Sequence, residues 1–153
     1  MKGPGRPPVR AAADPLLRRV AWAIAALYAV GLALLVFSPI GGALNELTVR
    51  LYVLWVYRLH GNPAVTPDWF GAGLNVVLFV PLGVLVVLLV RWPWWAATLL
   101  AVWVSAGIEL VQVIPVLHRV ASLEDVITNT TGGFAGALIG IRLRDSVRAR
   151  DIG

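Results

Sequence analysis

The chain has 153 residues, of which 59% are hydrophobic and only 14% are charged, and its mean hydropathy is +0.81. Soluble domains carry charge on about a quarter of their residues, so this composition predicts a membrane protein. The lack of cysteine excludes disulfides, zinc–thiolate sites and cysteine nucleophiles. The net charge of +5 does not indicate nucleic-acid binding, because the basic residues flank apolar segments, as an anionic membrane surface requires.

The first apolar segment, residues 16–38, has the length of a transmembrane helix. Residues 1–15 are rich in Pro, Gly and Arg, and they are predicted to form a disordered, basic cytoplasmic tail. A signal peptide is the alternative, because Arg18 and Arg19 precede the apolar core and small residues follow it. That core is longer than the usual ~7–15 residues of a signal, which favours an uncleaved helix.

Residues 43–59 mix leucines at helical spacing with polar and charged side chains, among them Glu46 and Arg50. The segment is too charged to predict a span. An amphipathic helix that lies in the membrane interface fits it better, with Trp55 and Tyr57 at the level of the lipid head groups. We therefore expect an interfacial helix in the first outer loop.

Three further spans are predicted, at residues 69–90, 93–117 and 122–141. The last begins as helices favour, with Ser122 as its N-cap and acidic residues in its first turn. Because its first two turns are polar, it is the weakest span by hydropathy. Residues 143–153 are predicted to be a second basic cytoplasmic tail. The predicted fold class is an all-α membrane protein, with a bundle of four transmembrane helices over residues 16–142.

The basic residues also predict the orientation of this bundle. With four spans and a cytoplasmic N-terminus, only Arg50, Arg58 and Arg119 of the 13 Lys and Arg residues lie outside, and the other ten lie inside. This bias follows the positive-inside rule. The sequence therefore predicts a multi-pass protein of the cell membrane with both termini in the cytoplasm.

Glu109 interrupts an apolar run of membrane length, and Gln112 lies one turn further along the same helical face. A carboxylate at mid-bilayer costs about 2.5–3.5 kcal/mol on insertion scales, and such groups are functional by default. A structural role, with Glu109 protonated or paired with Arg119 and capped by Gln112, stays open. In the predicted topology, polar residues from three spans and a loop converge on the outer leaflet. This predicted polar pocket consists of Asn75, Glu109, Gln112, Arg119, Asp125 and Asn129.

Glycines recur at every fourth residue of the last predicted span, and small residues at this spacing let a neighbouring helix approach closely. Asp125 and Asn129 lie on the face that continues into these glycines, so both are expected to meet the same partner helix as the glycines. In the second span, Pro81 frees the Val77 carbonyl and predicts a kink. The residues predicted for helix packing are Pro81, Gly83, Gly132, Gly136 and Gly140.

Three elements of the sequence carry a resemblance to a known family. They are Asn75-Val-Val-Leu-Phe79-Val-Pro81-Leu-Gly83, then Glu109-x-x-Gln112, and then Arg119-x-x-Ser122-x-x-Asp125-x-x-x-Asn129-x-x-Gly132. In this order, over about residues 69–141, the chain resembles the VanZ-like family, which is named for a membrane protein associated with teicoplanin resistance. The resemblance implies a small bacterial multi-pass membrane protein with a connection to the cell envelope or to antibiotic resistance. It implies no particular reaction.

Two functions of different class stay open. The first is a binding module, whose outer-leaflet pocket takes the head group of an envelope lipid or a lipid-like antibiotic, with a link to glycopeptide resistance or envelope maintenance. The second is an intramembrane enzyme that acts on a lipid-linked envelope substrate, with Glu109 or Asp125 as general acid or base. A transporter is a weaker alternative, because only four spans and no inverted repeat are detectable.

The expected partners are membrane lipids and a lipid-linked envelope precursor or a glycopeptide, and not nucleic acid. No metal is predicted, because His118 with Glu124 and Asp125 lacks a known ligand spacing. No cofactor is predicted either, because the glycine spacing suits helix packing better than a phosphate-binding loop. The oligomeric state and the identity of the ligand stay open.

Overall fold

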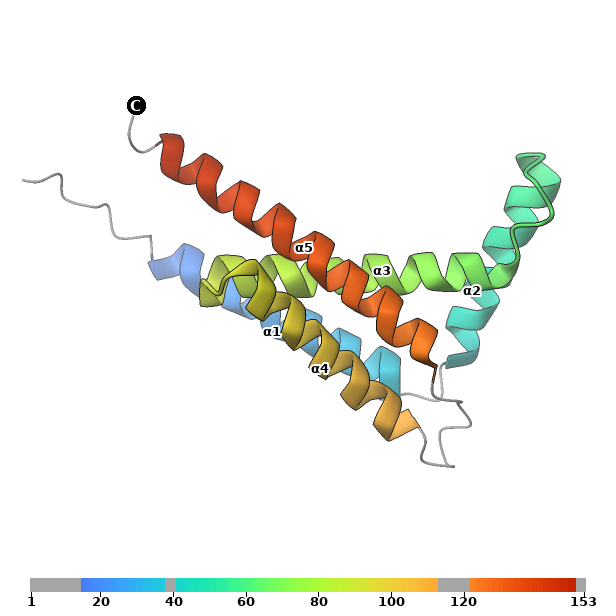
Figure 1. The fold of residues 1–153 in the computed structure, drawn as a ribbon, viewed down its shortest axis with the longest axis horizontal. Helices are drawn as coiled ribbons and strands as arrows, with labels where there is room; N and C mark the ends of the chain where they lie inside the picture. The colour runs from blue at the N-terminus through green and yellow to red at the C-terminus, as the bar shows by residue number, and fades with distance from the viewer. Residues whose placement is uncertain (1–14, 38–40, 113–121, 151–153) are drawn as a thin grey trace, which may run out of the picture.

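The computed structural model describes residues 15–37, 41–112 and 122–150, and within these residues the chain is helical and contains no strand. Figure 1 shows how the helices are arranged. Two short π-helices, η1 and η2, each continue a preceding α-helix. The elements are α1 (Pro15–Phe37), α2 (Gly41–Val53), η1 (Leu54–Arg58), α3 (Pro67–Leu85), η2 (Val86–Val90), α4 (Trp94–Gln112) and α5 (Leu123–Arg150).

Three helices of the described chain are long and apolar enough to cross a membrane: α1, α3 continued by η2, and α4. The prediction of an all-α membrane protein is therefore confirmed. The α5 helix is longer, with 28 residues, but it has Glu124 and Asp125 in its first turn and carries several arginines toward its end. Whether α5 completes a bundle of four transmembrane helices stays a prediction.

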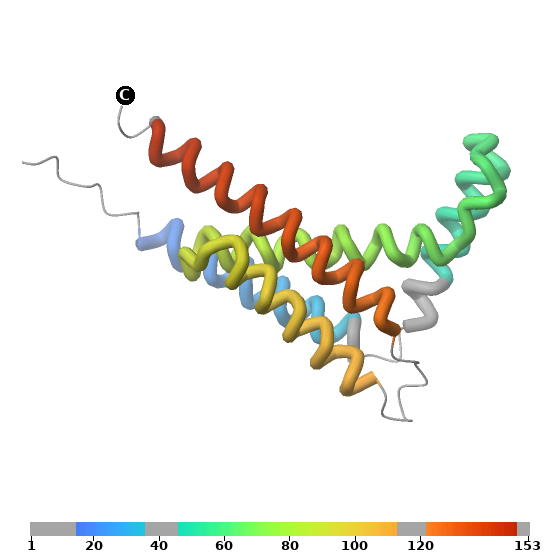
Figure 2. Tube along the Cα trace, viewed as in Figure 1, coloured from blue at the N-terminus to red at the C-terminus, as the bar shows by residue number. Residues whose placement is uncertain are grey.

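The α5 helix packs most extensively against α3, and next against α4 (Figures 1 and 2). The α1 helix is peripheral, because it has only sparse contact with α3. Helices α1 and α4 run in one direction and α3 and α5 in the other, so that α1 begins and α5 ends toward the same side of the molecule (Figure 2). The direction in which this side faces a membrane stays a prediction.

Glycines create the close contact between α3 and α5. A Cβ atom at Gly136 would overlap the backbone carbonyl of Val80, and a Cβ atom at Gly132 would overlap that of Val76. On the opposing helix, a Cβ atom at Gly83 would overlap the backbone of α5. Only hydrogen fits at these positions, which allows the two backbones to touch.

Two further glycines of α5 bring it close to η2 and to α4. A Cβ atom at Gly140 would lie 2.9 Å from the Cβ atom of Val87 in η2. Gly133 faces the other way, toward Ala101 of α4. Pro81, which the sequence also predicts to take part in helix packing, lies inside α3, and the helix continues through it. The α5 helix therefore lies between α3 and α4, with a glycine surface turned to each.

Two apolar clusters fill the space between the helices. One joins α3, α4 and α1 through Phe79, Ala101, Ile108 and Leu32, and the other joins η2, α4 and α5. The side chain of Tyr28 adds a polar link, because its hydroxyl donates a hydrogen bond of 2.9 Å to the backbone carbonyl of Leu78. This bond ties the peripheral α1 to α3.

The α2 and η1 helices cover the segment predicted as an interfacial helix, and they extend away from the others where α3 begins (Figure 1). Thr48 of α2 is buried, and its methyl group lies close to Gly71 of α3. Glu46 and Arg50 form an exposed ion pair of 2.6 Å one helical turn apart. The helical conformation agrees with the prediction, while its position at a membrane interface stays a prediction.

The predicted boundaries differ from the structure mainly at the C-terminus. The α5 helix continues beyond residue 141 to Arg150, through a segment that was predicted to be a tail. Residues 141–150 carry four arginines and contain neither Gly nor Pro, so nothing in them stops a helix. The predicted N-terminal tail, apart from Pro15, and the end of the third span at residues 113–117 lie outside the described residues.

Candidate functional site: a polar cluster shared by α3, α4 and α5

Glu109 meets the beginning of α5. Its side chain is only 7% exposed, and its Oε2 atom accepts a hydrogen bond of 2.7 Å from the backbone N–H of Ser122. Ser122 is the N-cap residue that the sequence predicts, and its Oγ atom accepts a long bond of 3.4 Å from the N–H of Asp125. The first N–H groups of a helix lack partners within the helix and favour negative charge nearby. The carboxylate of α4 thus satisfies a donor at the start of α5.

Asn75 and Asp125 link α3 to the same end of α5. The Nδ2 atom of Asn75 donates a hydrogen bond of 2.9 Å to Oδ1 of Asp125, across a half-buried contact. Asp125 lies in the first turn of α5, where its charge also complements the helix dipole. The Asp125 carboxylate therefore both stabilises the start of α5 and joins α5 to α3.

Asn129 lies one turn further along α5 and bonds to a different helix. Its Nδ2 atom donates a hydrogen bond of 3.0 Å to the hydroxyl of Ser105 on α4, and both side chains are buried. Asp125 bonds to α3, the helix that Gly132 and Gly136 also meet, whereas Asn129 bonds to α4, so the expectation that both residues meet the same helix as these glycines is wrong for Asn129. The Oδ1 atom of Asn129 is buried and accepts no hydrogen bond from the described part of the chain.

Gln112 follows Glu109 by one helical turn and is also buried, with 4% of its surface exposed. The two residues share the face that their spacing predicts. Arg119, predicted to lie beside Glu109, is outside the described residues. The structure therefore places five of the predicted pocket residues in the three packed helices, at the end where α5 begins: Asn75, Glu109, Gln112, Asp125 and Asn129.

Sequence reasoning did not foresee some partners of these residues. The hydrogen bond from the backbone N–H of Ser122 to Glu109 could not be predicted, because it depends on how α5 packs on α4. Ser105 lies on the face of Glu109 and Gln112, a spacing visible in the sequence, but its bond to Asn129 is a tertiary contact. Thr48, a buried residue of α2, had no distinguishing pattern.

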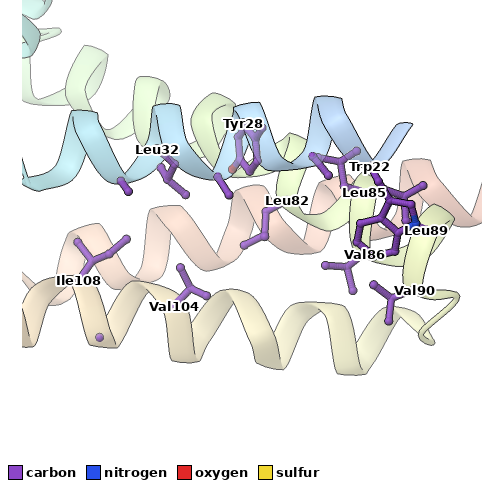
Figure 3. A pocket seen from close by; sticks show the side chains of 14 residues that line it. Trp22, Tyr28, Leu32, Leu82, Leu85, Val86, Leu89, Val90, Val104 and Ile108 are labelled. Carbon is purple, nitrogen blue, oxygen red and sulfur yellow. The ribbon is translucent and has the colours of Figure 1, made fainter. Parts of the chain in front are cut away.

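Two cavities among the described residues lie elsewhere. A groove of about 410 Å³ runs between α1 on one side and α3, η2 and α4 on the other, as Figure 3 shows. A second cavity, of about 430 Å³, lies beside the beginning of α1. None of the predicted pocket residues lines either cavity. In residues 15–37, 41–112 and 122–150, no group of three or more His, Cys, Asp or Glu side chains could hold a metal ion.

The fold and the site together define a class of protein. Three membrane-length apolar helices, with a polar cluster built where α5 packs on α3 and α4, are the features of a helical integral membrane protein. The VanZ/LLP1 family model matches residues 22–144, so the chain belongs to the VanZ/LLP1 family. The match spans all three sequence elements that resemble the VanZ-like pattern, and the resemblance is confirmed. Searches of the curated proteins and of the solved structures found no match.

Proposed function

We propose that this VanZ-like protein binds the polar head group of an envelope lipid or of a lipid-like antibiotic at the polar cluster. A role in glycopeptide resistance or in maintenance of the cell envelope would follow from such binding. The observation that carries the proposal is the Oδ1 atom of Asn129, a buried acceptor with no partner among the described residues. An unsatisfied buried acceptor costs about 1–3 kcal/mol, which a ligand that donates a hydrogen bond would recover.

The chemistry of the cluster fits a head group rich in hydrogen-bond donors. An amide oxygen such as that of Asn129 accepts from the N–H or O–H groups that peptide and sugar head groups carry. Gln112 adds a second buried amide from α4, and Glu109 and Asp125 add carboxylate oxygens. The cluster also lies at one end of the packed helices, at the start of α5, as a head-group site requires.

Binding is better supported than acid–base catalysis. A general acid or base must face the group that reacts. The Oε2 atom of Glu109 instead faces a backbone N–H, and the Oδ1 atom of Asp125 faces the amide of Asn75. These contacts give one oxygen of each carboxylate a hydrogen-bond donor within the fold.

Direct titration of the purified protein tests the proposal. The full chain in lipid nanodiscs is titrated with teicoplanin and, separately, with an undecaprenyl-linked peptidoglycan precursor. For the probe that binds, we expect Asn129→Ala to weaken binding by about tenfold, the value of one hydrogen bond of ordinary strength. Thr131→Ala is the matched control, because Thr131 is exposed on the same helix and donates its hydrogen bond to the backbone carbonyl of Ile127, one turn earlier. Failure of both probes to bind, or equal binding by Asn129→Ala and the wild type, would overturn the proposal.

A further inference from the structure

The groove beside α1 has walls that leave room for a chain of methylene groups. On α1 the lining residues are the small Ala25, Ala29 and Ala33, one on each successive turn, together with the larger Trp22, Tyr28 and Leu32. The three alanines leave space between α1 and the opposite walls. Leucines and valines of α3, η2 and α4 form the opposite walls (Figure 3). The groove is therefore apolar along its length, apart from the indole N–H of Trp22 and the Tyr28 hydroxyl, which already bonds to α3.

One end of the groove is positively charged. Trp22 lines both the groove and the second cavity, whose other lining residues are Pro15, Arg18 and Arg19. Neither arginine forms an ion pair with a described residue, and both are exposed. Arg91 is exposed as well, and it directly follows Val90, a lining residue at this end of the groove. The apolar groove thus opens onto a cationic surface through Trp22.

The dimensions fit one leaflet of a bilayer. From Trp22 to Ala33 the helix rises by about 16 Å at 1.5 Å per residue. Half of a hydrocarbon core of about 30 Å is about 15 Å. A lipid whose head lies beside Arg18 and Arg19 would therefore bury its acyl chain along the whole groove.

We propose that this groove binds one anionic phospholipid, with an acyl chain between α1 and α3 and a phosphate beside Arg18 and Arg19. Guanidinium groups suit phosphate in charge and geometry, which favours a phospholipid over an apolar helix of a second copy. The choline of a neutral phospholipid would add a third cation beside Arg18 and Arg19, which favours a lipid of net negative charge. In the predicted orientation the arginines face the cytoplasm, so the lipid comes from the cytoplasmic leaflet. No residue of the polar cluster lines the groove, and this site is separate from the head-group site proposed above.

Native mass spectrometry of the full chain tests this assignment. The detergent-solubilised protein is offered phosphatidylglycerol and phosphatidylcholine that carry identical acyl chains, and the retained lipid is counted. We expect one retained phosphatidylglycerol, and roughly thirtyfold weaker retention by the double variant Arg18→Gln/Arg19→Gln, since each basic residue contributes about 1 kcal/mol near an anionic lipid. The matched control is Arg142→Gln/Arg148→Gln, which removes the same charge from exposed residues that line neither cavity.

A second variant tests the groove itself. Ala29→Phe places a ring between α1 and the opposite wall, and we expect it to reduce phosphatidylglycerol retention. Ala26→Phe is the matched control and should leave retention unchanged, because Ala26 is exposed on α1 and lines neither cavity. Equal retention of the two lipids, equal loss in both arginine pairs, or a protein dimer that Ala29→Phe abolishes in place of a lipid adduct would each overturn the proposal. These outcomes do not depend on whether teicoplanin or a peptidoglycan precursor binds at the polar cluster.

Discussion

The contact between α3 and α5 predicts that the smallest possible substitution at Gly136 is costly. The added Cβ atom of Gly136→Ala would overlap the backbone carbonyl of Val80, and a backbone atom cannot rotate away as a side chain can. The helices must separate instead, and overpacking of this kind costs about 1–3 kcal/mol. Alanine also favours the helical conformation by about 0.5–1 kcal/mol over glycine, which offsets part of that cost.

A second glycine separates these two effects. Gly73 lies on α3, and a Cβ atom there would meet nothing within 4 Å. Gly73→Ala therefore carries only the gain in helix propensity. The difference between the free energies of unfolding of the two variants isolates the cost of the overlap, which we expect to be about 1–3 kcal/mol.

The assay is reversible unfolding in mixed micelles of increasing dodecyl sulfate content, followed by tryptophan fluorescence. We expect Gly136→Ala to unfold at a lower dodecyl sulfate fraction than the wild type, and Gly73→Ala at an equal or higher fraction. Equal stability of the two variants would refute the close contact between α3 and α5.

Three further predictions follow from individual contacts. Tyr28→Phe should lower the free energy of unfolding by about 0.5–1.5 kcal/mol, because the hydrogen bond to α3 is lost, and should speed amide exchange in α1 more than in α5. An equal increase in both helices would contradict the idea that Tyr28 holds α1 to α3. A double-mutant cycle with Asn75→Leu and Asp125→Leu should give a coupling energy of about 0.6 kcal/mol, and at most about 1.7, whereas additive effects would contradict their bond. In the naturally cysteine-free chain, single cysteines in place of Asn62 and Trp92 should label from opposite sides of the membrane, outside and inside respectively; the reverse pattern would contradict the predicted orientation.

Local spacing predicted the parts of the cluster that lie on a single helix. Glu109 and Gln112 are one turn apart, and both are buried on one face of α4. Ser122 is the N-cap of α5, and Asp125, three residues later, donates its backbone N–H to the Ser122 hydroxyl, as the capping pattern predicts. Such features depend only on the helical repeat, which the sequence displays directly.

Contacts between helices were less accessible from the sequence. Asp125 and Asn129 are separated by one turn, yet they bond to α3 and α4 respectively, because α5 lies between those helices. The glycine pattern predicted close packing, but it did not reveal that Gly133 faces α4 while Gly136 faces α3. Which helix a face meets depends on the packing of the whole bundle, and periodicity carries no information about it.

The groove beside α1 could not be predicted from the sequence either. Alanines at positions 25, 29 and 33 count as apolar residues in any span, and nothing in their spacing distinguishes a groove from a packed interface. The distinction depends on the distance between α1 and α3, which the Tyr28 hydroxyl bridges at one point. In the sequence, Arg18 and Arg19 indicate only the orientation of the first span. Their position beside the groove depends on the fold.

The substitution Glu109→Gln tests the central claim, that the polar cluster binds a ligand as well as joining the helices. Glutamine keeps an oxygen that can accept from the Ser122 N–H, so the helix contact can persist while the charge is removed. Glu46→Gln is the matched control, because Glu46 is an exposed carboxylate of α2.

The measurement is the teicoplanin concentration that inhibits a susceptible host expressing each form, together with the amount of protein in its membrane. The account predicts that the wild type and Glu46→Gln raise this concentration, and that Glu109→Gln loses the effect at unchanged membrane abundance. A loss that follows falling abundance, or full protection by Glu109→Gln, would contradict it.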